Sequence, residues 1–191
     1  MLNDLFEYFK SSHTIVSGGQ TGADQAGLEA ARTLGYRTGG WAPNGWETME
    51  GPQKELLQSY GLKEHAGGYR PRTVQNVRDS DFTIIISRVW RSPGTILTIN
   101  ACARERKPFI ALQETGKVYQ CSADLLDSRY MDKLKLDEMT EEEKLYDFYA
   151  SILRCYPVIN CAGNAENNAP GITSTSFNIF FNIFKKMYPE K

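Results

Sequence analysis

The strongest candidate for ligand chemistry is a glycine-rich segment, residues 17–24, with the sequence Ser-Gly-Gly-Gln-Thr-Gly-Ala-Asp. Its three glycines leave bare backbone N–H groups where a predicted strand must turn into a helix. Donors at a helix N-terminus attract phosphate or carboxylate, and Gln20 and Thr21 add side-chain donors. A plainer interpretation stays open, in which the glycines only permit a tight turn and close packing. The segment is neither a Walker A loop nor a G-x-G-x-x-G dinucleotide fingerprint.

A second loop of the same kind, residues 87–95, also joins a predicted buried strand to a predicted helix. Thr95 can cap that helix, and Gly94 lets a phosphate approach the backbone closely. Two Gly-Thr loops on neighbouring strands favour one shared anionic ligand. The alternative is an exposed loop whose Arg88 and Arg91 are only solvated.

Two further segments carry side chains that suit a flat, phosphorylated ligand. Arg70 and Arg72 can grip phosphate through paired N–H groups, while Thr73 and Asn76 can hydrogen-bond a ring edge. The two indoles of segment 39–46 can stack on a heterocycle. Each segment also has a structural interpretation, because charged runs usually form solvated faces and Trp side chains usually belong to a core or an interface.

Catalytic arrangements are poorly represented. A hydrolase triad would need His13 or His65, but His13 precedes a strand at its amino end and His65 has no obvious nucleophile nearby. Asp24 and Asp79 lie near the candidate loops, so a carboxylate base is possible but not indicated. The four cysteines contain no C-x-x-C pair, and with two histidines they leave little from which to build a metal site. We expect no catalytic residues and no metal.

The order of the predicted elements positions these loops. We expect strands at 13–17, 36–41, 82–86, 108–112 and 157–161, and helices at 2–10, 26–34, 71–79, 95–106, about 140–154 and 177–188. Strands that alternate with helices predict an α/β fold: a Rossmann-like, doubly wound, mainly parallel sheet flanked by helices, in a single domain over 1–191. In such sheets ligands bind at the carboxyl ends of the strands, where the loops above lie.

Two parts of the chain stand apart from this alternation. Residues 1–12 are predicted to form an N-terminal helix laid on the body of the domain. Residues 114–150 form an acidic, partly helical insertion with ten acidic and five basic residues. Within it, Thr140 followed by Glu143 is a capping-box signature for a helix that runs to Arg154.

The charge composition argues against one class of function. The chain has 22 Lys+Arg and 23 Asp+Glu in 191 residues, a formal net charge of −1, whereas general nucleic-acid binders are usually strongly basic. The near-zero net charge conceals two segments of opposite charge. Residues 70–107 hold seven Arg and one Lys against three acids, and the insertion is acidic. We therefore expect a small anionic ligand and no general nucleic-acid binding.

Location follows from what the sequence lacks. No apolar run approaches the roughly 20 residues that span a bilayer, and the start shows no basic region followed by an apolar core. Irregularly spaced cysteines are typical of free thiols in a reducing compartment. We expect a cytoplasmic protein with no membrane partner.

Taken together, these motifs resemble those of the molybdenum-cofactor carrier family. That family belongs to a wider Rossmann-like group with lysine-decarboxylase-like proteins and cytokinin-activating phosphoribohydrolases. The resemblance rests on segments 17–24, 39–45, 69–73, 76–81, 94–98 and 107–108, with a weaker match at 160–163 and 170–172. It implies a Rossmann-like homo-oligomer, a dimer or tetramer. It also implies a molybdopterin-type or nucleotide-like phosphate ligand at the carboxyl edge of the sheet.

The resemblance also assigns roles to residues. The glycine-rich segment from Gly19 to Gly22 would hold phosphate together with Gly94 and Thr95, and Trp41, Arg72 and Asn76 would flank the ring system. The full set of expected binding residues is Gly18, Gly19, Gln20, Thr21, Gly22, Asp24, Trp41, Asn44, Arg70, Arg72, Thr73, Asn76, Ser87, Gly94 and Thr95.

Three functions remain as hypotheses at this point. The first is a carrier-type or sensor-type protein that binds a phosphorylated heterocycle without transforming it. The second is a nucleotide-processing hydrolase, a phosphoribohydrolase-like N-glycosidase. Relatives with that activity place a Glu in the helix after the Gly-Thr loop, near Asn100 of this chain. The third is an interaction scaffold with a decayed ligand site.

Overall fold

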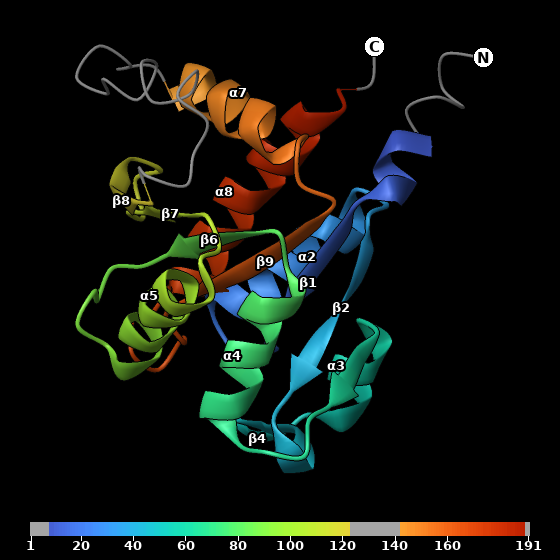
Figure 1. The fold of residues 1–191 in the computed structure, drawn as a ribbon, viewed down its shortest axis with the longest axis vertical. Coiled ribbons are helices and arrows are strands. Elements are labelled where there is room, and N and C mark those ends of the chain that lie inside the picture. The colour runs from blue at the N-terminus through green and yellow to red at the C-terminus, as the bar shows by residue number, and fades with distance from the viewer. Residues whose placement is uncertain (1–7, 123–141, 190–191) are drawn as a thin grey trace.

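The computed structural model describes residues 8–122 and 142–189, and seven of its strands form one sheet in the order β5-β2-β1-β9-β6-β7-β8 (Figure 1). All neighbours in this sheet are parallel except β7 and β8, which are antiparallel. A separate antiparallel pair, β3 and β4, forms a short hairpin. The strands are β1 Thr14–Ser17, β2 Arg37–Ala42, β3 Glu47–Thr48, β4 Gly51–Pro52, β5 Leu62–Glu64, β6 Phe82–Ile86, β7 Phe109–Leu112, β8 Val118–Cys121 and β9 Val158–Gly163.

The last strand in the sequence, β9, lies in the middle of the sheet between β1 and β6. Ile159 of β9 pairs with Ile15 on one side and with Phe82 on the other. If β9 and the helix after it preceded β1, the central strands would follow the order 3-2-1-4-5 of a doubly wound sheet. The chain therefore has a doubly wound layout whose first strand–helix unit stands at its C-terminal end.

Helices cover both faces of this sheet. In Figure 1, α4 and α5 lie in front of the sheet and α2 lies behind it, where α2 packs against α8 and α8 against α7. Within the described residues, no helix is long and apolar enough to cross a membrane. The helices are α2 Ala23–Thr33, α3 Lys54–Ser59, α4 Tyr69–Asp79, α5 Pro93–Glu105, α7 Glu142–Leu153 and α8 Ile172–Met187, with a short 3₁₀ turn η1 at Asn44–Trp46.

Strand β6 shows why the sheet needs helices on both faces. Its five residues are all buried, and successive side chains point to opposite sides. Ile84 and Ile86 belong to the larger core cluster with residues of α7 and α8, whereas Ile85 packs with Val77 of α4. The expectation that this strand is buried on both faces is confirmed.

Most of the expected elements occur within a few residues of the expected positions, and the α/β fold class is confirmed. The hairpin β3–β4, helix α3 and the edge strands β5 and β8 are additions. The acidic insertion contributes β8 at one end and α7 at the other. Thr140 and its capping box lie outside the described residues, as does the first part of the N-terminal helix, which is helical from Tyr8 to Ser12.

Candidate functional site

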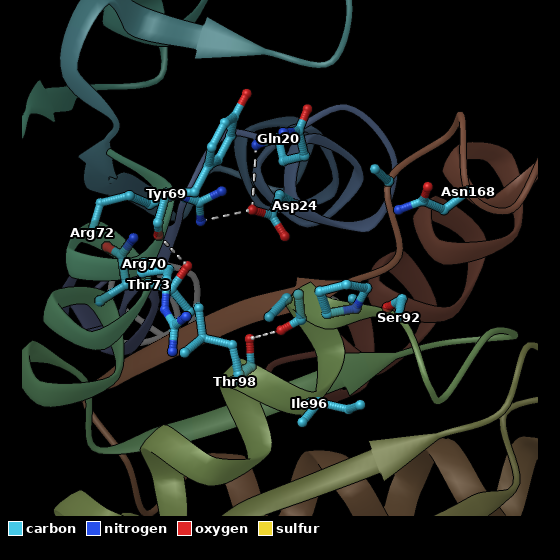
Figure 2. A pocket seen from close by; sticks show the side chains of 18 of the residues that line it. Gln20, Asp24, Tyr69, Arg70, Arg72, Thr73, Ser92, Ile96, Thr98 and Asn168 are labelled. Atoms are coloured by element: carbon cyan, nitrogen blue, oxygen red, sulfur yellow. Dashed lines mark hydrogen bonds and ion pairs between the residues drawn. The ribbon is translucent and has the colours of Figure 1, made fainter. Parts of the chain in front are cut away.

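A cavity of about 770 Å³ opens at the carboxyl edge of the sheet (Figure 2). Its walls come from the β1–α2 loop, the first two turns of α4, the start of α5 and the end of β9 with the loop that follows. From this point the chain continues from β1 toward one edge of the sheet and from β6 toward the other. The cavity therefore occupies the topological switch point, where doubly wound proteins bind ligands.

The floor of the cavity holds a buried ion pair that joins two helices. Asp24 lies in the first turn of α2, and its Oδ2 is 3.3 Å from Nη1 of Arg72 in the first turn of α4. The two side chains are only 8% and 9% exposed, so water screens this pair little. Burial raises the pKa of Asp24, and the neighbouring guanidinium and the N–H of Gln20 act in the opposite direction.

Arg72 also has a donor without an acceptor. Its Nε is buried and has no hydrogen-bond partner among the described residues, although the side chain lines the cavity. A buried donor left without an acceptor costs about 1–3 kcal/mol. The site is thus chemically incomplete at a cationic group, and a ligand oxygen or ring nitrogen in the cavity would suit it.

The glycine-rich loop differs from the expected phosphate cradle. The N–H of Gln20 donates to the Asp24 carboxylate at 3.3 Å, and the N–H of Thr21 donates to the side-chain oxygen of Gln20 at 2.9 Å. Gly22 has φ +97°, and a Cβ there would overlap the carbonyl oxygen of Asn164. The backbone N–H groups of Gln20 and Thr21 are thus engaged inside the protein, and the Asp24 carboxylate accepts one of them at this helix start.

Asn164, in the loop after β9, connects the three loops that surround the cavity. Its Oδ1 accepts the hydroxyl of Ser87 at 2.9 Å and two backbone N–H groups of the β6–α5 loop at 2.8 Å. Its Nδ2 donates to the hydroxyls of Ser92 and Thr95, each at 3.1 Å. Its carbonyl oxygen accepts the N–H of Ala23 at the start of α2. This one residue fixes the starts of α2 and α5 relative to each other.

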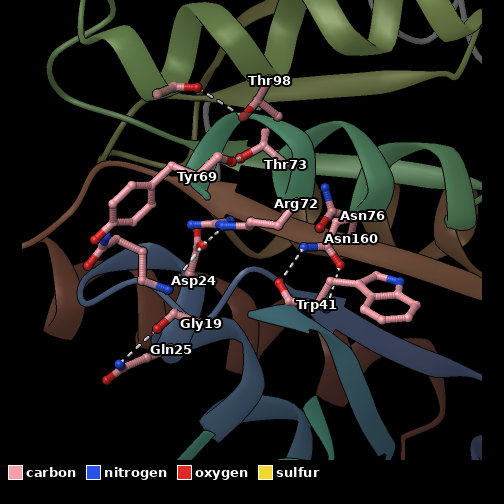
Figure 3. Close-up of polar contacts among 12 residues, drawn as sticks. Gly19, Asp24, Gln25, Trp41, Tyr69, Arg72, Thr73, Asn76, Thr98 and Asn160 are labelled. Carbon is pink, nitrogen blue, oxygen red and sulfur yellow. Dashed lines mark hydrogen bonds and ion pairs between the residues drawn. The ribbon is translucent and has the colours of Figure 1, made fainter. Parts of the chain in front are cut away.

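Asn76 and Trp41 serve mainly to join α4 to β2 (Figure 3). The amide of Asn76 accepts the backbone N–H of Trp41 at 2.9 Å and donates to its carbonyl at 3.0 Å. The indole of Trp41 donates to Asp79 at 2.8 Å and does not line the cavity. The other indole, Trp46, is 7% exposed and packs in a small core cluster with Leu57.

The mouth of the cavity is cationic and apolar. Arg70 and Arg91 are exposed, and neither guanidinium has a hydrogen bond or an ion pair within the described part of the chain. Gly94 lies beside them in the first turn of α5, where backbone N–H groups have no partner within the helix. Tyr69 and Ile96 are 42% and 43% exposed at the same mouth. A ligand here would meet positive charge and large apolar side chains together.

The expected binding residues fall into two groups. Those that line the cavity are Gly18, Gln20, Asp24, Arg70, Arg72, Thr73, Asn76 and Gly94. Those that lie outside its lining are Gly19, Thr21, Gly22, Trp41, Asn44, Ser87 and Thr95. Of the second group, Ser87 and Thr95 are buried and bonded to the Asn164 amide, and Asn44 is exposed.

Sequence reasoning missed several lining residues. Arg91, Asn160 and Asn168 were not expected to bind, yet all three line the cavity. Asn160 and Asn168 come from the β9 region, and only the placement of β9 at the centre of the sheet brings them here. The signal available in the sequence was the pair of turn motifs that follows this strand, at Asn164 and Pro170-Gly171.

The cavity offers little for acid–base or metal chemistry. Asp24 is the only carboxylate among the described residues that line it, and Arg72 pairs with that carboxylate. No group of three or more His, Cys, Asp or Glu side chains that could hold a metal ion occurs in the described ranges. All four cysteines are free thiols, and burial raises the pKa of Cys161 well above its ordinary value.

Fold and site together define a doubly wound α/β protein with a ligand-sized cavity at its switch point. The chain belongs to the family described as "Circularly permutated YpsA SLOG family", whose sequence model matches residues 15–184. The strand order of this chain is itself permuted, because moving the C-terminal strand–helix unit to the front gives the doubly wound order.

One solved structure is similar over nearly the whole chain. It is a crystal structure of a candidate molybdenum carrier protein from Syntrophus aciditrophicus SB. The two chains are 26% identical with a TM-score of 0.65, and the match covers 89% of this chain and 93% of the other. A comparison with curated proteins found no match.

Proposed function

We propose that this protein binds a phosphorylated heterocycle, of the pterin or nucleotide class, in the switch-point cavity and does not transform it. The observation that carries the proposal is the cationic lining. Within the described residues, Arg72 has a buried donor without an acceptor, and Arg70 and Arg91 at the mouth have no side-chain partner. A volume of about 770 Å³ falls within the range of ligand pockets. The likeness to a candidate molybdenum carrier supports a pterin-type cargo.

The charges also suggest how the ligand lies. Asp24 already occupies the anion position of the β1–α2 loop, so a phosphate there would meet a carboxylate. Arg70, Arg91 and the start of α5 at Gly94 offer the opposite environment. We place the phosphate at this mouth and the heterocycle over the floor, where Arg72 and Asn160 can hydrogen-bond its edge.

The lining favours binding over hydrolysis. An N-glycosidase needs a group that moves a proton or stabilises a developing positive charge, and carboxylates serve best. The lining position in α5 that resembles the Glu of hydrolase relatives is Asn100, whose amide has no acid–base role. The remaining carboxylate, Asp24, is paired with Arg72. A cytoplasmic location and a homo-oligomeric state, a dimer or tetramer, are parts of the same proposal.

Native mass spectrometry of the protein purified from its own host tests the proposal. We expect a co-purifying mass in the range of a phosphorylated pterin or a nucleotide, and a rise in Tm when guanosine monophosphate or a pterin phosphate is added. Arg91→Gln should weaken the Tm shift. Arg37→Gln, which removes the same charge at the amino end of β2, should not change it. A ligand-free protein with no Tm shift would overturn the proposal, and release of free guanine would favour the hydrolase.

A further inference from the structure

A second hollow of about 440 Å³ lies between α4 and α5, on the outer side of the cavity. Arg70 and Leu97 line both spaces, so the groove continues directly from the cavity mouth. Arg70 and Thr98 lie on the facing sides of the two helices (Figure 2). From Arg70 to Arg78, which also lines the groove, α4 advances by about 12 Å at 1.5 Å per residue.

The groove combines an apolar floor with cationic sides. Pro71, Val74 and Leu97 supply apolar surface, and Val74 packs on the core cluster beneath. Arg70, with no side-chain partner in the described ranges, stands at the end that meets the cavity. Apolar surface flanked by guanidinium groups suits a planar ring, because guanidinium groups also stack on aromatic faces.

The far end of the groove holds two more arginines, Arg78 and Arg104. Arg78 forms a two-bond contact with Glu105, at 3.0 and 3.1 Å, and its charge is largely matched there. Arg104 also contacts Glu105, at 3.3 Å, but its side chain is 64% exposed. Asp79 also interacts with Arg78, so two carboxylates balance the two guanidinium groups at this end, whereas Arg70 at the other end has no such partner in the described ranges. The uncompensated positive charge of the groove therefore lies at the Arg70 end, next to the cavity, and the exposed Arg104 is the cation that a ligand can reach at the far end.

We propose that the ligand is of the dinucleotide type, with two heterocycles joined through a diphosphate. One heterocycle lies in the cavity, the second lies in the α4–α5 groove, and Arg70 at the junction takes the diphosphate between them. This inference rests on the proposed function, since it extends the same site. The two hollows are continuous through Arg70 and Leu97, which distinguishes this arrangement from a separate surface site.

Isothermal titration with a matched pair of probes tests this extension. Guanosine monophosphate can fill the cavity alone, whereas P1,P2-di(guanosine-5′) diphosphate can fill the cavity and the groove. We expect the second probe to bind at least about tenfold more tightly, which corresponds to about 1.4 kcal/mol. Arg104→Glu, a change confined to the groove, should lower the affinity for the dinucleotide about fivefold and leave the affinity for the mononucleotide unchanged. Arg37→Glu, with the same charge change at a distant edge, should alter neither affinity.

The outcomes separate this inference from the proposed function. If guanosine monophosphate binds and the dinucleotide binds no more tightly, the cavity is a site and the groove is not, which overturns the inference alone. If Arg104→Glu weakens both probes equally, the groove has no separate role, which also overturns it. If neither probe binds, the inference is wrong, and the native mass spectrum and the Tm shift with a pterin phosphate then decide the proposed function separately.

Discussion

The guanidinium of Arg72 occupies the space into which a side chain on Gly18 would project. A Cβ built on Gly18 would overlap Nη1 and Cζ of Arg72. The missing side chain lets an arginine from α4 cross over the end of β1 and reach Asp24 in α2. At this position, the need for glycine comes from an ion pair across the cavity floor, not from the approach of a phosphate.

Gly18→Ala therefore tests the packing of the floor. The added methyl group should push the guanidinium away from Asp24, which we expect to lower the free energy of unfolding by about 1–3 kcal/mol, as overpacking does. It should also weaken the binding of guanosine monophosphate at least about tenfold, because the displaced guanidinium enters the space for the ligand. Urea denaturation and titration calorimetry measure the two effects. Gly68→Ala is the control, since a Cβ there meets nothing within 4 Å, and equal behaviour of the two variants would contradict this account.

The Asp24–Arg72 pair predicts non-additive stability changes. Asp24→Asn and Arg72→Gln should each lower the free energy of unfolding by about 3 kcal/mol, because each leaves one buried partner without its counter-charge. The double variant should lose less free energy of unfolding than the two single variants together, by about 1 kcal/mol or more. A double-mutant cycle by chemical denaturation gives this coupling directly. Strict additivity would show that the two side chains do not interact energetically.

Asn164→Ala should loosen the loops around the cavity. The substitution leaves the buried hydroxyls of Ser87 and Thr95 without the amide that they contact, at a cost of about 2–4 kcal/mol. Hydrogen exchange should accelerate in residues 87–95 more than in the distant strand β2. Ser151→Ala, which removes a hydroxyl on α7, provides a comparison for general destabilisation. Unchanged exchange in residues 87–95 would rule out the connecting role.

We expect Glu166, which binds the start of α8, to stabilise the fold in a pH-dependent way. The hydroxyl of Thr173 and the N–H groups of Gly171 and Thr173 donate to its carboxylate and lower its pKa below 4.5. A lowered carboxyl pKa stabilises the fold at pH values above 4.5, and this stabilisation is lost as the pH falls through the lowered value. Glu166→Gln should therefore cost about 1 kcal/mol at pH 7 and progressively less in acid.

Thermal unfolding from pH 7 to pH 3 compares the two proteins. The Tm difference between the native chain and Glu166→Gln should shrink steadily over this range. Glu50→Gln is the matched control, because Glu50 is an exposed carboxylate outside this cap. A constant Tm difference across the range would mean that the charge of Glu166 contributes nothing.

The pattern of neighbouring residues in the sequence was enough to predict the main strands and helices of the fold. β6 is five consecutive apolar or β-branched residues, and Gly35, just after the C-cap of α2, adopts φ +80°. Such signals arise from near neighbours, so they can be identified in the sequence alone. Strands β3, β4 and β5 have only two or three residues each, which is too short to show the alternation of apolar and polar residues that predicts a strand.

The features that could not be predicted depend on contacts between residues far apart in the sequence. The apolar run of β9 predicts a strand, but nothing within it specifies a place between β1 and β6. Asp24 and Arg72 are 48 residues apart, and Asn164 contacts residues 69 to 77 positions away. The sequence therefore indicated where loops gather. It did not indicate that the Asp24 carboxylate would accept an N–H of its own loop, nor that Arg72 would pair with this carboxylate.

A crystal structure of the protein with bound guanosine monophosphate tests the central claim most directly. The account predicts a phosphate oxygen within about 3 Å of the Gly94 N–H and close to Arg91, with the Asp24–Arg72 pair intact beneath the base. A phosphate in the loop from Gly19 to Gly22 with Asp24 displaced, or a cavity that stays empty at saturating ligand, would contradict it.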